Sequence, residues 1–420
     1  MEQLALYGGI KYKNTPFTTG KRFGEADLQQ LREALEQNTL FYWKGKKVKT
    51  LTSKFAELYG VPYCVAASSG TAAIHVALGA VGVTEGDEVI TTPITDMGTV
   101  IGILYQNAIP VFADLEPHTY NMDPKSIEEK ITDKTKAILV VHLAGNPADM
   151  DPIMDIARRY HLKVVEDCAQ SYLSYYKGRL AGTIGDVGCF SLNDFKQISA
   201  GDGGLCIMRD EDTYSAALRF ADKNYDRQGK TDKAMRGVEY VAPNYRMNEL
   251  TGAVGISQLQ RLPAVCDTLN RWGERITQGI KDLPGVYPHL VQEGNKSSYW
   301  FYMYRIDPKQ FSVDIDEYIR ALKAEGFTGC QKGYLDCCIY EYDLFKNKSA
   351  YPGTNAPFTS PYYGKDIQYE KGLCPVAEEI LETAIKFKPT EFYTEKDIDD
   401  IIAIIRKVTL YFWKGDRCDD

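Results

Sequence analysis

Short apolar runs alternate with segments of helical periodicity between residues 51 and 210. The apolar runs predict seven strands, at residues 63–67, 88–92, 111–114, 137–143, 163–167, 188–192 and 204–208. Helices are expected between them, at residues 71–78, 123–131 and 151–160. Strands that alternate with helices are typical of a mostly parallel sheet with crossover helices, so we predict a large α/β domain built on a seven-stranded sheet.

A different pattern begins after residue 248. Residues 249–278 form one long helical stretch, which Pro263 is expected to break or bend. After it we expect an aromatic strand at 299–306, a helix at 315–325, and a closing helix that Thr394 caps with Asp397 answering. The predicted domains are a large domain with an N-terminal arm at residues 1–250, a linking helix at 251–285 and a smaller C-terminal α+β domain at 286–420.

The charge balance argues against a nucleic-acid partner. The chain has 420 residues and a net charge of −8, with a pI near 5.4, whereas a nucleic-acid surface needs clustered Lys and Arg. Nowhere do about 18 uncharged apolar residues follow one another, so we expect no membrane-spanning helix. We therefore expect neither a nucleic-acid nor a membrane partner.

The cysteines and histidines predict no metal centre. The ten cysteines lack the paired CxxC spacing of a zinc site and of a short disulfide framework, which fits a reducing cytoplasm. The five histidines are scattered, and no HExxH motif joins them. His142 closes an expected strand. It either borders a ligand pocket or is a packed, hydrogen-bonded side chain.

Three segments are candidates for chemistry because each follows the end of an expected strand. The first is Ser-Ser-Gly-Thr-Ala-Ala at residues 68–73. Small residues let the backbone approach an anion closely, and the N–H groups and dipole of a helix start attract it. This turn can therefore hold a phosphate. It can also be a plain tight turn in which serine caps the helix.

The second segment runs from an apolar strand directly into two acids, Glu166 and Asp167. Ligands of open α/β sheets bind outside the carboxyl ends of the strands, which places such an acid for chemistry. A carboxylate there can hold the protonated pyridine nitrogen of a pyridoxal cofactor. The alternative is that one of the two acids caps the next helix.

The third segment places Lys196 between an aromatic residue, Phe195, and a Gly-Asp-Gly-Gly turn at residues 201–204. Partial desolvation in such a setting lowers the pKa of a lysine and makes its amine available as a nucleophile. The alternative is a solvated surface lysine, as most lysines are.

Taken in order, these segments resemble the DegT/DnrJ/StrS family of sugar aminotransferases, which are fold type I pyridoxal-phosphate enzymes. The resemblance covers nearly the whole chain, and so many ordered matches are far more specific than any one of them. The matching pieces are SGTAA at 69–73, GDEVI at 86–90, VHLAG at 141–145, EDCAQ at 166–170, Phe190-Ser191 before Lys196, GDGG at 201–204 and NYRM at 244–247.

The resemblance implies a role for each matching residue. Lys196 would carry pyridoxal phosphate through a Schiff base and later move the proton between carbon centres. Asp167 would pair with the pyridine nitrogen, and Gln170 would contact the phenolic oxygen of the ring. Gly70, Thr71 and Ser191 would hold the phosphate, and Asn244 would reach it from the neighbouring subunit. These roles imply a homodimer with shared active sites.

The chain departs from the family pattern at three places. Relatives commonly place an aromatic residue over the cofactor ring where this chain has Met97, whose thioether can also pack on a π face. The usual Gly-Glu-Gly-Gly turn carries Asp202 instead of glutamate. A histidine-containing substrate loop is replaced by Tyr-Leu-Asp-Cys-Cys at residues 334–338, which puts the identity of the substrate in doubt.

Transamination is the function that the resemblance implies. Glutamate or glutamine would donate an amino group, and a keto group on a sugar nucleotide or a keto-cyclitol would accept it. The opening Leu-Tyr-Gly-Gly at residues 6–9 and the following residues 11–16 resemble the cyclitol branch slightly more.

Three other functions compete with transamination. A sugar dehydratase of the same family replaces the lysine with histidine, and Lys196 argues against that. A non-catalytic regulatory protein has no chemical need for Lys196, Asp167 and Gln170 together. A Rossmann dehydrogenase needs a GxGxxG motif after an early strand, and the sequence has none there.

Overall fold

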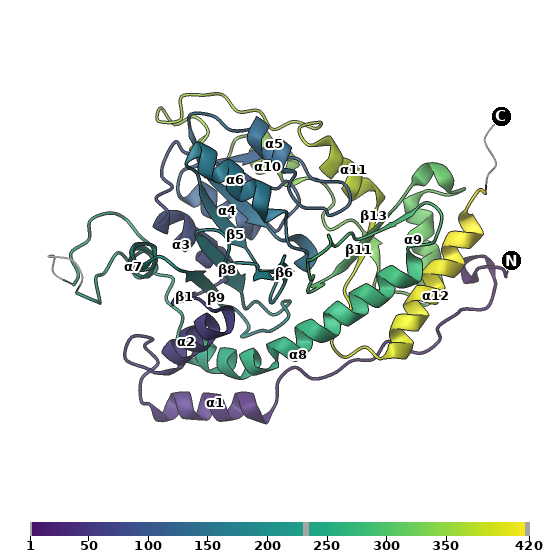
Figure 1. Ribbon diagram of the computed structural model, residues 1–420, viewed down its shortest axis with the longest axis horizontal. Helices are drawn as coiled ribbons and strands as arrows, with labels where there is room; N and C mark the ends of the chain where they lie inside the picture. Colours follow the sequence, from purple (N-terminus) through teal and green to yellow (C-terminus); the bar gives the residue numbers. More distant parts are fainter. Residues whose placement is uncertain (1, 230–234, 416–420) are drawn as a thin grey trace.

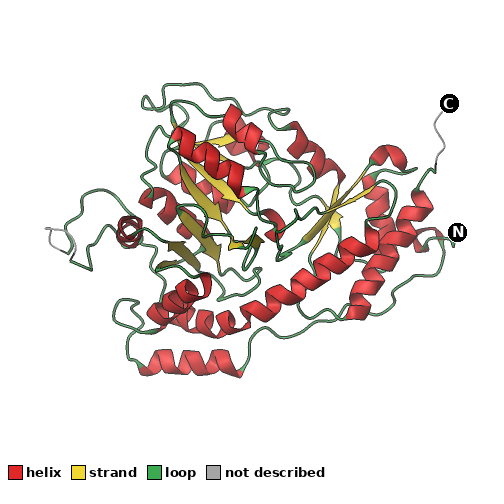
Figure 2. Ribbon diagram, in the orientation of Figure 1, coloured by secondary structure: helices red, strands yellow, loops and turns green. Residues whose placement is uncertain are grey.

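The computed structural model describes residues 2–229 and 235–415 (Figures 1 and 2). Its larger body is built on a seven-stranded sheet in the order β1-β9-β8-β5-β4-β2-β3. The pairings are parallel from β8 to β3, and only β9 runs against its neighbours. This confirms the predicted mostly parallel sheet. The strands are β1 (Tyr63–Ala67), β2 (Glu88–Thr91), β3 (Ile109–Phe112), β4 (Thr135–Val141), β5 (Lys163–Asp167), β8 (Val187–Ser191) and β9 (Gly204–Met208).

Helices cover both faces of this sheet, so most of its strands are buried throughout, as parallel strands usually are. The helix α3 contacts α4 and α7 and packs on β8 and β9, while α2 packs against β1. The crossover helices predicted at residues 71–78, 123–131 and 151–160 are α3, α5 and α6. The helices of this body are α2 (Lys47–Tyr59), α3 (Gly70–Ala80), α4 (Met97–Tyr105), α5 (Pro124–Glu129), α6 (Met150–Tyr160) and α7 (Glu211–Phe220).

The helix α8 (Glu249–Ile280) links the two halves of the molecule (Figure 1). Its 32 residues span about 48 Å at 1.5 Å per residue. One end contacts α1 (Glu25–Glu36) and α2, and α8 also contacts α12 and β10 of the smaller half. The helix runs through Pro263 without a break. The break considered from the sequence is therefore absent, because the neighbouring Leu262 and Val265 are buried and their packing offsets the lost hydrogen bond.

The smaller half contains a four-stranded antiparallel sheet in the order β10-β11-β13-β12. Thr394 and Asp397 form the predicted capping box at the start of α12. The elements are β10 (Val286–Pro288), β11 (Tyr302–Ile306), α9 (Ile315–Ala324), β12 (Gln331–Lys332), α11 (Pro375–Thr383), β13 (Ala384–Phe387) and α12 (Glu395–Phe412). A small α+β unit follows the linking helix, as expected, and the exact division at residues 250 and 285 stays a prediction.

The N-terminal segment contacts the smaller half. Leu4 lies in its hydrophobic core, and the N–H of Ala5 donates to Glu325 at 2.8 Å. The ammonium of Lys13 is buried between Asp397, at 3.1 Å, and Asp400, at 2.8 Å. Figure 1 shows the N-terminus beside α12. This arm therefore joins the start of the chain to its last helix.

The remaining short elements lie in connections between the main ones. The hairpin of β6 and β7 follows β5, and α10 belongs to the long segment that reaches the edge strand β3, where Phe345 and Tyr369 pack on Phe112. These elements are η1 (Ala5–Tyr7), η2 (Leu143–Gly145), β6 (Tyr175–Tyr176), β7 (Arg179–Leu180), η3 (Pro308–Gln310), η4 (Ile339–Glu341) and α10 (Asp343–Lys346).

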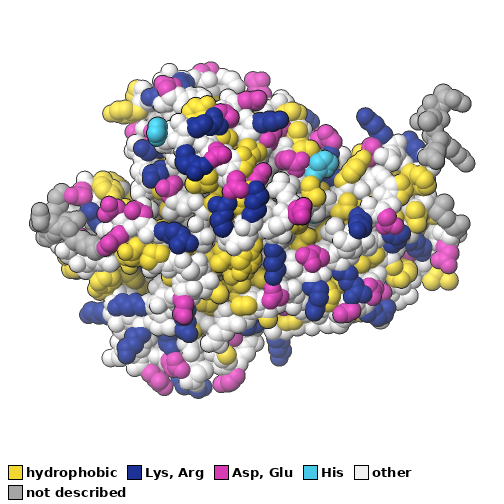
Figure 3. Space-filling model, viewed as in Figure 1, with side chains coloured by type: hydrophobic (Ala, Val, Ile, Leu, Met, Phe, Trp, Pro, Cys, Tyr) yellow, Lys and Arg dark blue, Asp and Glu magenta, His cyan; other side chains and the backbone are white. Residues whose placement is uncertain are grey.

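The described helices and the surface drawn in Figure 3 bear on the expected partners. Among helices in the described ranges, none is long and apolar enough to cross a membrane. On the face drawn in Figure 3, Lys and Arg side chains are interspersed with Asp and Glu, and hydrophobic side chains gather in the middle, above α8. That face therefore carries no extended basic patch of the kind that binds nucleic acid.

Candidate active site

A cavity of about 310 Å³ lies at the carboxyl ends of the large sheet's strands. This is where open α/β sheets bind ligands, and the volume lies within the roughly 300–1,000 Å³ of ligand pockets. Residues that follow β1, β2, β5 and β8 meet there. Six residues predicted from the sequence line it together, namely Gly70, Thr71, Asp167, Gln170, Ser191 and Lys196.

The start of α3 forms an anion cradle in this cavity. Ser69 caps the helix by accepting from the N–H of Ala72 at 3.0 Å. By helix geometry, the N–H groups of Gly70 and Thr71 have no carbonyl partner within α3. A Cβ added at Gly70 would lie 2.6 Å from the Cβ of Ser191, so only glycine allows this close approach. The serine cap is therefore confirmed, and phosphate binding at this turn stays a prediction.

Asp167 is 4% exposed and ends β5 at the cavity. Its carboxylate accepts from the hydroxyl of Thr99 at 2.8 Å and from the N–H of Ala169 at 3.0 Å. Burial raises the pKa of Asp167, and these hydrogen bonds and the charge of Lys196 oppose the rise. A cation bound in the cavity would further favour the ionised carboxylate of Asp167. No sequence motif singles out Thr99, which lies in the first turn of α4.

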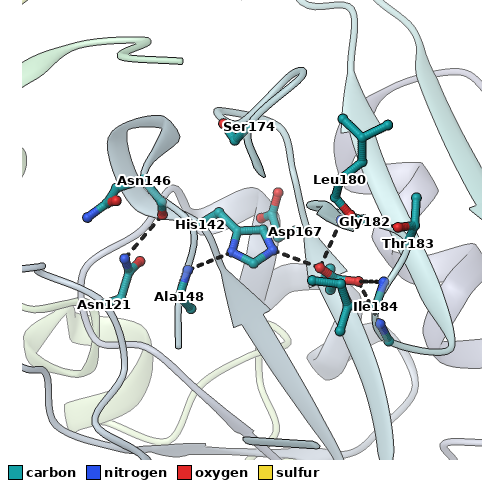
Figure 4. A network of polar contacts seen from close by, with 12 residues as sticks. Asn121, His142, Asn146, Ala148, Asp167, Ser174, Leu180, Gly182, Thr183 and Ile184 are labelled. Carbon is teal, nitrogen blue, oxygen red and sulfur yellow. Dashed lines mark hydrogen bonds and ion pairs between the residues drawn. The ribbon is translucent and has the colours of Figure 1, made fainter. Parts of the chain in front are cut away.

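The neighbouring acid, Glu166, is held in a buried network with His142 and Gly182, the two of its partners that Figure 4 labels beside Ile184. Its carboxylate accepts from His142 at 2.9 Å and from the N–H groups of Gly182, Ile184 and Gly185 at 2.7 to 2.8 Å. Burial opposes ionisation, but the hydrogen bonds and the His142 ring lower the pKa of Glu166. Glu166 therefore supports the loop after β7, and Asp167 alone of the two acids lines the cavity.

His142 is fully buried and belongs to the same network. Its Nδ1 accepts from the N–H of Ala148 at 3.0 Å, so the proton lies on Nε2 and is donated to Glu166. Within the described residues, the candidate ligand atoms of His142, Glu166 and Cys168 lie within 4.8 Å of one another. Because the histidine and carboxylate atoms are already hydrogen-bonded, we assign this cluster a structural role. The packed alternative for His142 is the one observed.

Lys196 enters the cavity below the indole ring of Trp300. Its Nζ lies 4.0 Å from the ring centroid. Burial lowers the pKa of Lys196, and the negative charges of Asp167 and Asp96 oppose this. The lysine is therefore partly desolvated, as expected from its sequence context, and the surface alternative does not hold.

The sequence pattern gives Trp300 no role in the site, because it predicts a strand at residues 299–306 that contains this residue. The strand β11 begins only at Tyr302. Tyr299 has a positive φ of 42°, and the N–H of Trp300 donates to the carbonyl of Ala144 at 2.9 Å. The indole N–H donates to the carbonyl of Phe195 at 2.6 Å. These bonds pull the chain away from the small sheet and place the ring over Lys196.

Gln170 presents its amide to the cavity in a defined direction. The amide oxygen accepts from the N–H of Ala144 at 2.8 Å, and the backbone carbonyl accepts from Gln197 at 2.8 Å. The amide NH₂ is thus the group available to a ligand oxygen.

Two residues of the predicted set lie outside the cavity lining. Met97 is the first residue of α4 and packs against the core, while its neighbours Asp96 and Gly98 line the cavity. Asn244 is exposed, and it forms a backbone bridge with Asp222. An exposed position is compatible with contact to a second subunit, which is what the sequence resemblance implies for Asn244.

Comparison with known proteins places this chain in one family. The model of the DegT/DnrJ/EryC1/StrS aminotransferase family matches residues 21–361. A solved aminotransferase from Psychrobacter cryohalolentis is 28% identical, with a TM-score of 0.81 over 94% of this chain and 100% of that one.

Two curated relatives have named activities. One, from Streptoalloteichus tenebrarius, is provisionally named L-glutamine:3-amino-2,3-dideoxy-scyllo-inosose aminotransferase. It is 35% identical over 329 residues, which are 77% of this chain and 78% of the relative. An Escherichia coli GDP-perosamine synthase is 38% identical over 285 residues, 68% of this chain and 75% of the relative. The chain belongs to the DegT/DnrJ/EryC1/StrS family of pyridoxal-phosphate-dependent aminotransferases.

Proposed function

We propose that this protein binds pyridoxal 5′-phosphate at Lys196 and transfers an amino group from glutamate or glutamine to a keto group on a sugar nucleotide or keto-cyclitol. The observation that carries the proposal is the convergence of three features in one cavity. These are the partly desolvated Lys196, the buried carboxylate of Asp167, and the anion cradle of Gly70 and Ser191. Each supplies something that this cofactor requires.

The residues of the cavity fit the chemical groups of the cofactor. The cradle that a Cβ at Gly70 would fill suits the phosphate, whose charge the start of α3 attracts. The amide NH₂ of Gln170 suits the phenolic oxygen, and the carboxylate of Asp167 suits the pyridine nitrogen. When bound, the cofactor supplies a ring that accepts electron density from the carbon being deprotonated.

Two residues would then act on protons. Lys196 would carry the cofactor and move a proton between carbon centres, because its lowered pKa leaves more of the amine neutral. Asp167 would keep the pyridine nitrogen protonated, and Thr99 would orient that carboxylate through its 2.8 Å hydrogen bond. The indole of Trp300 would shield Lys196 from water.

The substrate class rests on the named relatives. One is named for glutamine and an amino-dideoxy-inosose, and the other for a product linked to GDP. The two relatives are 35% and 38% identical to this chain, which supports a ring-shaped keto acceptor. These similar values do not separate a keto-cyclitol from a sugar nucleotide. A dehydratase of the family or a regulatory protein remains the alternative, and Lys196 in its desolvated position weighs against both.

The amino-transfer half-reactions test this function. Glutamate or glutamine should convert the absorbance of the cofactor-loaded protein from the aldehyde form to the amine form. Keto-sugar nucleotides and inososes should then be screened for return of the aldehyde spectrum. Failure of both donors to change the spectrum of a fully loaded protein would contradict the proposal.

We further propose a homodimer in which Asn244 completes the partner's phosphate site. Its support is the exposed position of Asn244, outside the cavity of its own chain. If Asn244→Ala and Lys196→Ala are each inactive alone, a mixed dimer should contain one site with both defects and one with neither. Activity should return to about half of wild type per dimer if the two sites act independently. No recovery despite demonstrated subunit exchange, or a fully active monomer, would contradict the shared site.

A cytoplasmic location completes the proposal. It is supported by the cysteine content, since all nine cysteines in the described ranges are free thiols.

A further inference from the structure

A row of lysines lies over a wall of aromatic rings beside Lys196. The Nζ of Lys388 is 5.1 Å from the centroid of Trp300, the same ring that Lys196 approaches. The Nζ of Lys386 is 5.2 Å from the centroid of Phe301 and 5.1 Å from that of Tyr334. Neither Lys386 nor Lys388 belongs to the motifs that identify the family.

The smaller half of the molecule builds this arrangement. Lys386 lies in β13 and Lys388 just beyond its end, two residues apart, so an extended chain directs both side chains to one face. The rings come from the segment before β11 and from the loop after β12. Phe301 stacks on Tyr334 with their centroids 5.1 Å apart, and Trp300 meets Tyr334 edge-on at 6.3 Å.

The charge of these two lysines lacks a close counter-ion. In the parts of the chain that the structure describes, Lys386 and Lys388 form no ion pair within 4.0 Å. Glu391, whose charge favours protonated Lys388, pairs with Arg261 at 3.2 Å. Burial and the nearby positive charges of Arg22 and Lys196 lower the pKa of Lys388 to about 8, and burial lowers that of Lys386.

Lys388 is also tied to the catalytic segment. Its ammonium donates to the carbonyl of Phe195, which also accepts from the indole of Trp300. Lys386 is half-buried and Lys388 is exposed, so a ligand can reach both ammonium groups beside the ring that Lys196 also approaches. A bound anion would supply the missing charge, and the aromatic wall would give its carbon skeleton a flat surface.

We propose that Lys388, assisted by Lys386, forms a substrate subsite beside Lys196 that binds a negatively charged oxygen group, either the carboxylate of the amino donor or the diphosphate of a sugar nucleotide. The proposal rests on the proposed function for the identity of these substrates. An amino acid that reacts at Lys196 carries its carboxylate one carbon away from the reacting amine. The position of Lys388 over the shared ring suits that group.

Anion binding without turnover tests the subsite. Titration calorimetry on the cofactor-loaded protein would measure the Kd of glutarate, which is glutamate without its amine, and of inorganic pyrophosphate. Loading with cofactor keeps the phosphate cradle filled. Lys388→Met should raise the Kd of the anion that uses the subsite by at least about tenfold, because a charge-assisted hydrogen bond is lost. Lys388→Arg should largely retain binding, and Lys332→Met, on β12 of the same sheet, is the matched control.

Each outcome distinguishes a source or overturns the subsite. If Lys388→Met weakens the binding of glutarate alone, the subsite binds the carboxylate of the amino donor. If it weakens the binding of pyrophosphate alone, the subsite binds the diphosphate of a sugar nucleotide. Lys386→Met is the second variant and should weaken the binding of the same anion. Unchanged affinity for both anions in a Lys388→Met protein that melts like wild type would overturn the proposal, as would wild-type protein that binds neither. Lys388-dependent binding in a protein that transfers no amino group would refute only the proposed function.

Discussion

Lys196→Ala is expected to abolish turnover while leaving the fold intact. Positioned proton transfer alone contributes roughly 10²–10⁴-fold, and the variant also loses the covalent attachment of the cofactor, so kcat should fall by more than about 10³-fold. The side chain reaches into a cavity and is no part of the hydrophobic core, so the melting temperature should change little. Steady-state rates with both substrates and a melting curve provide the measurement.

The control for this variant is Lys125→Ala, which removes an exposed lysine near the start of α5. It should retain wild-type rates. If Lys196→Ala also kept wild-type rates with donor and acceptor, the role of Lys196 would be wrong, and Lys388 would be the next lysine to examine.

Asp167→Asn should keep the cofactor but lose activity by about 10²–10³-fold or more. A neutral amide cannot stabilise the protonated pyridine nitrogen, and loss of one preorganised electrostatic partner typically costs that much. The substitution should fold, because the Thr99 hydroxyl can reverse its hydrogen bond and accept from the new NH₂ group. Cofactor absorbance and kcat should be measured on the same sample.

Near-normal rates in Asp167→Asn would instead assign the pyridine nitrogen to another acid, or point to a different cofactor. Glu166 is the neighbour in sequence, but its carboxylate is already surrounded by His142 and three backbone N–H groups. A partner role for Glu166 would require that network to open.

The large sheet could be predicted from the sequence because its strands are short, buried apolar runs separated by helices. The expected strands at 63–67, 163–167 and 204–208 match β1, β5 and β9 residue for residue. The strand expected at 111–114 lies two residues late, since β3 begins at Ile109. Pro110 occupies the second position of that edge strand, where its missing N–H donor is tolerated. Because proline is rare inside strands, the sequence pattern favours a strand that starts after it.

The candidate site was predictable where it follows strand ends, and not where distant parts of the chain meet. Asp167, Ser191 and Lys196 lie at or just beyond the ends of β5 and β8, which the topology brings together. Trp300 and Lys388 come from the smaller half, and their positions depend on contacts with residues 144 and 195. No local pattern of hydrophobic and polar residues encodes such long-range contacts.

The most direct test of the central claim is to identify the lysine that carries the cofactor. Reduction of the cofactor-loaded protein with borohydride, followed by proteolysis and mass spectrometry, fixes the label on the residue to which it was bound. We predict a pyridoxyl label on the peptide that contains Lys196, close to one per chain. A label on Lys388 or another lysine, or no label on a protein that retains its cofactor absorbance, would contradict the account.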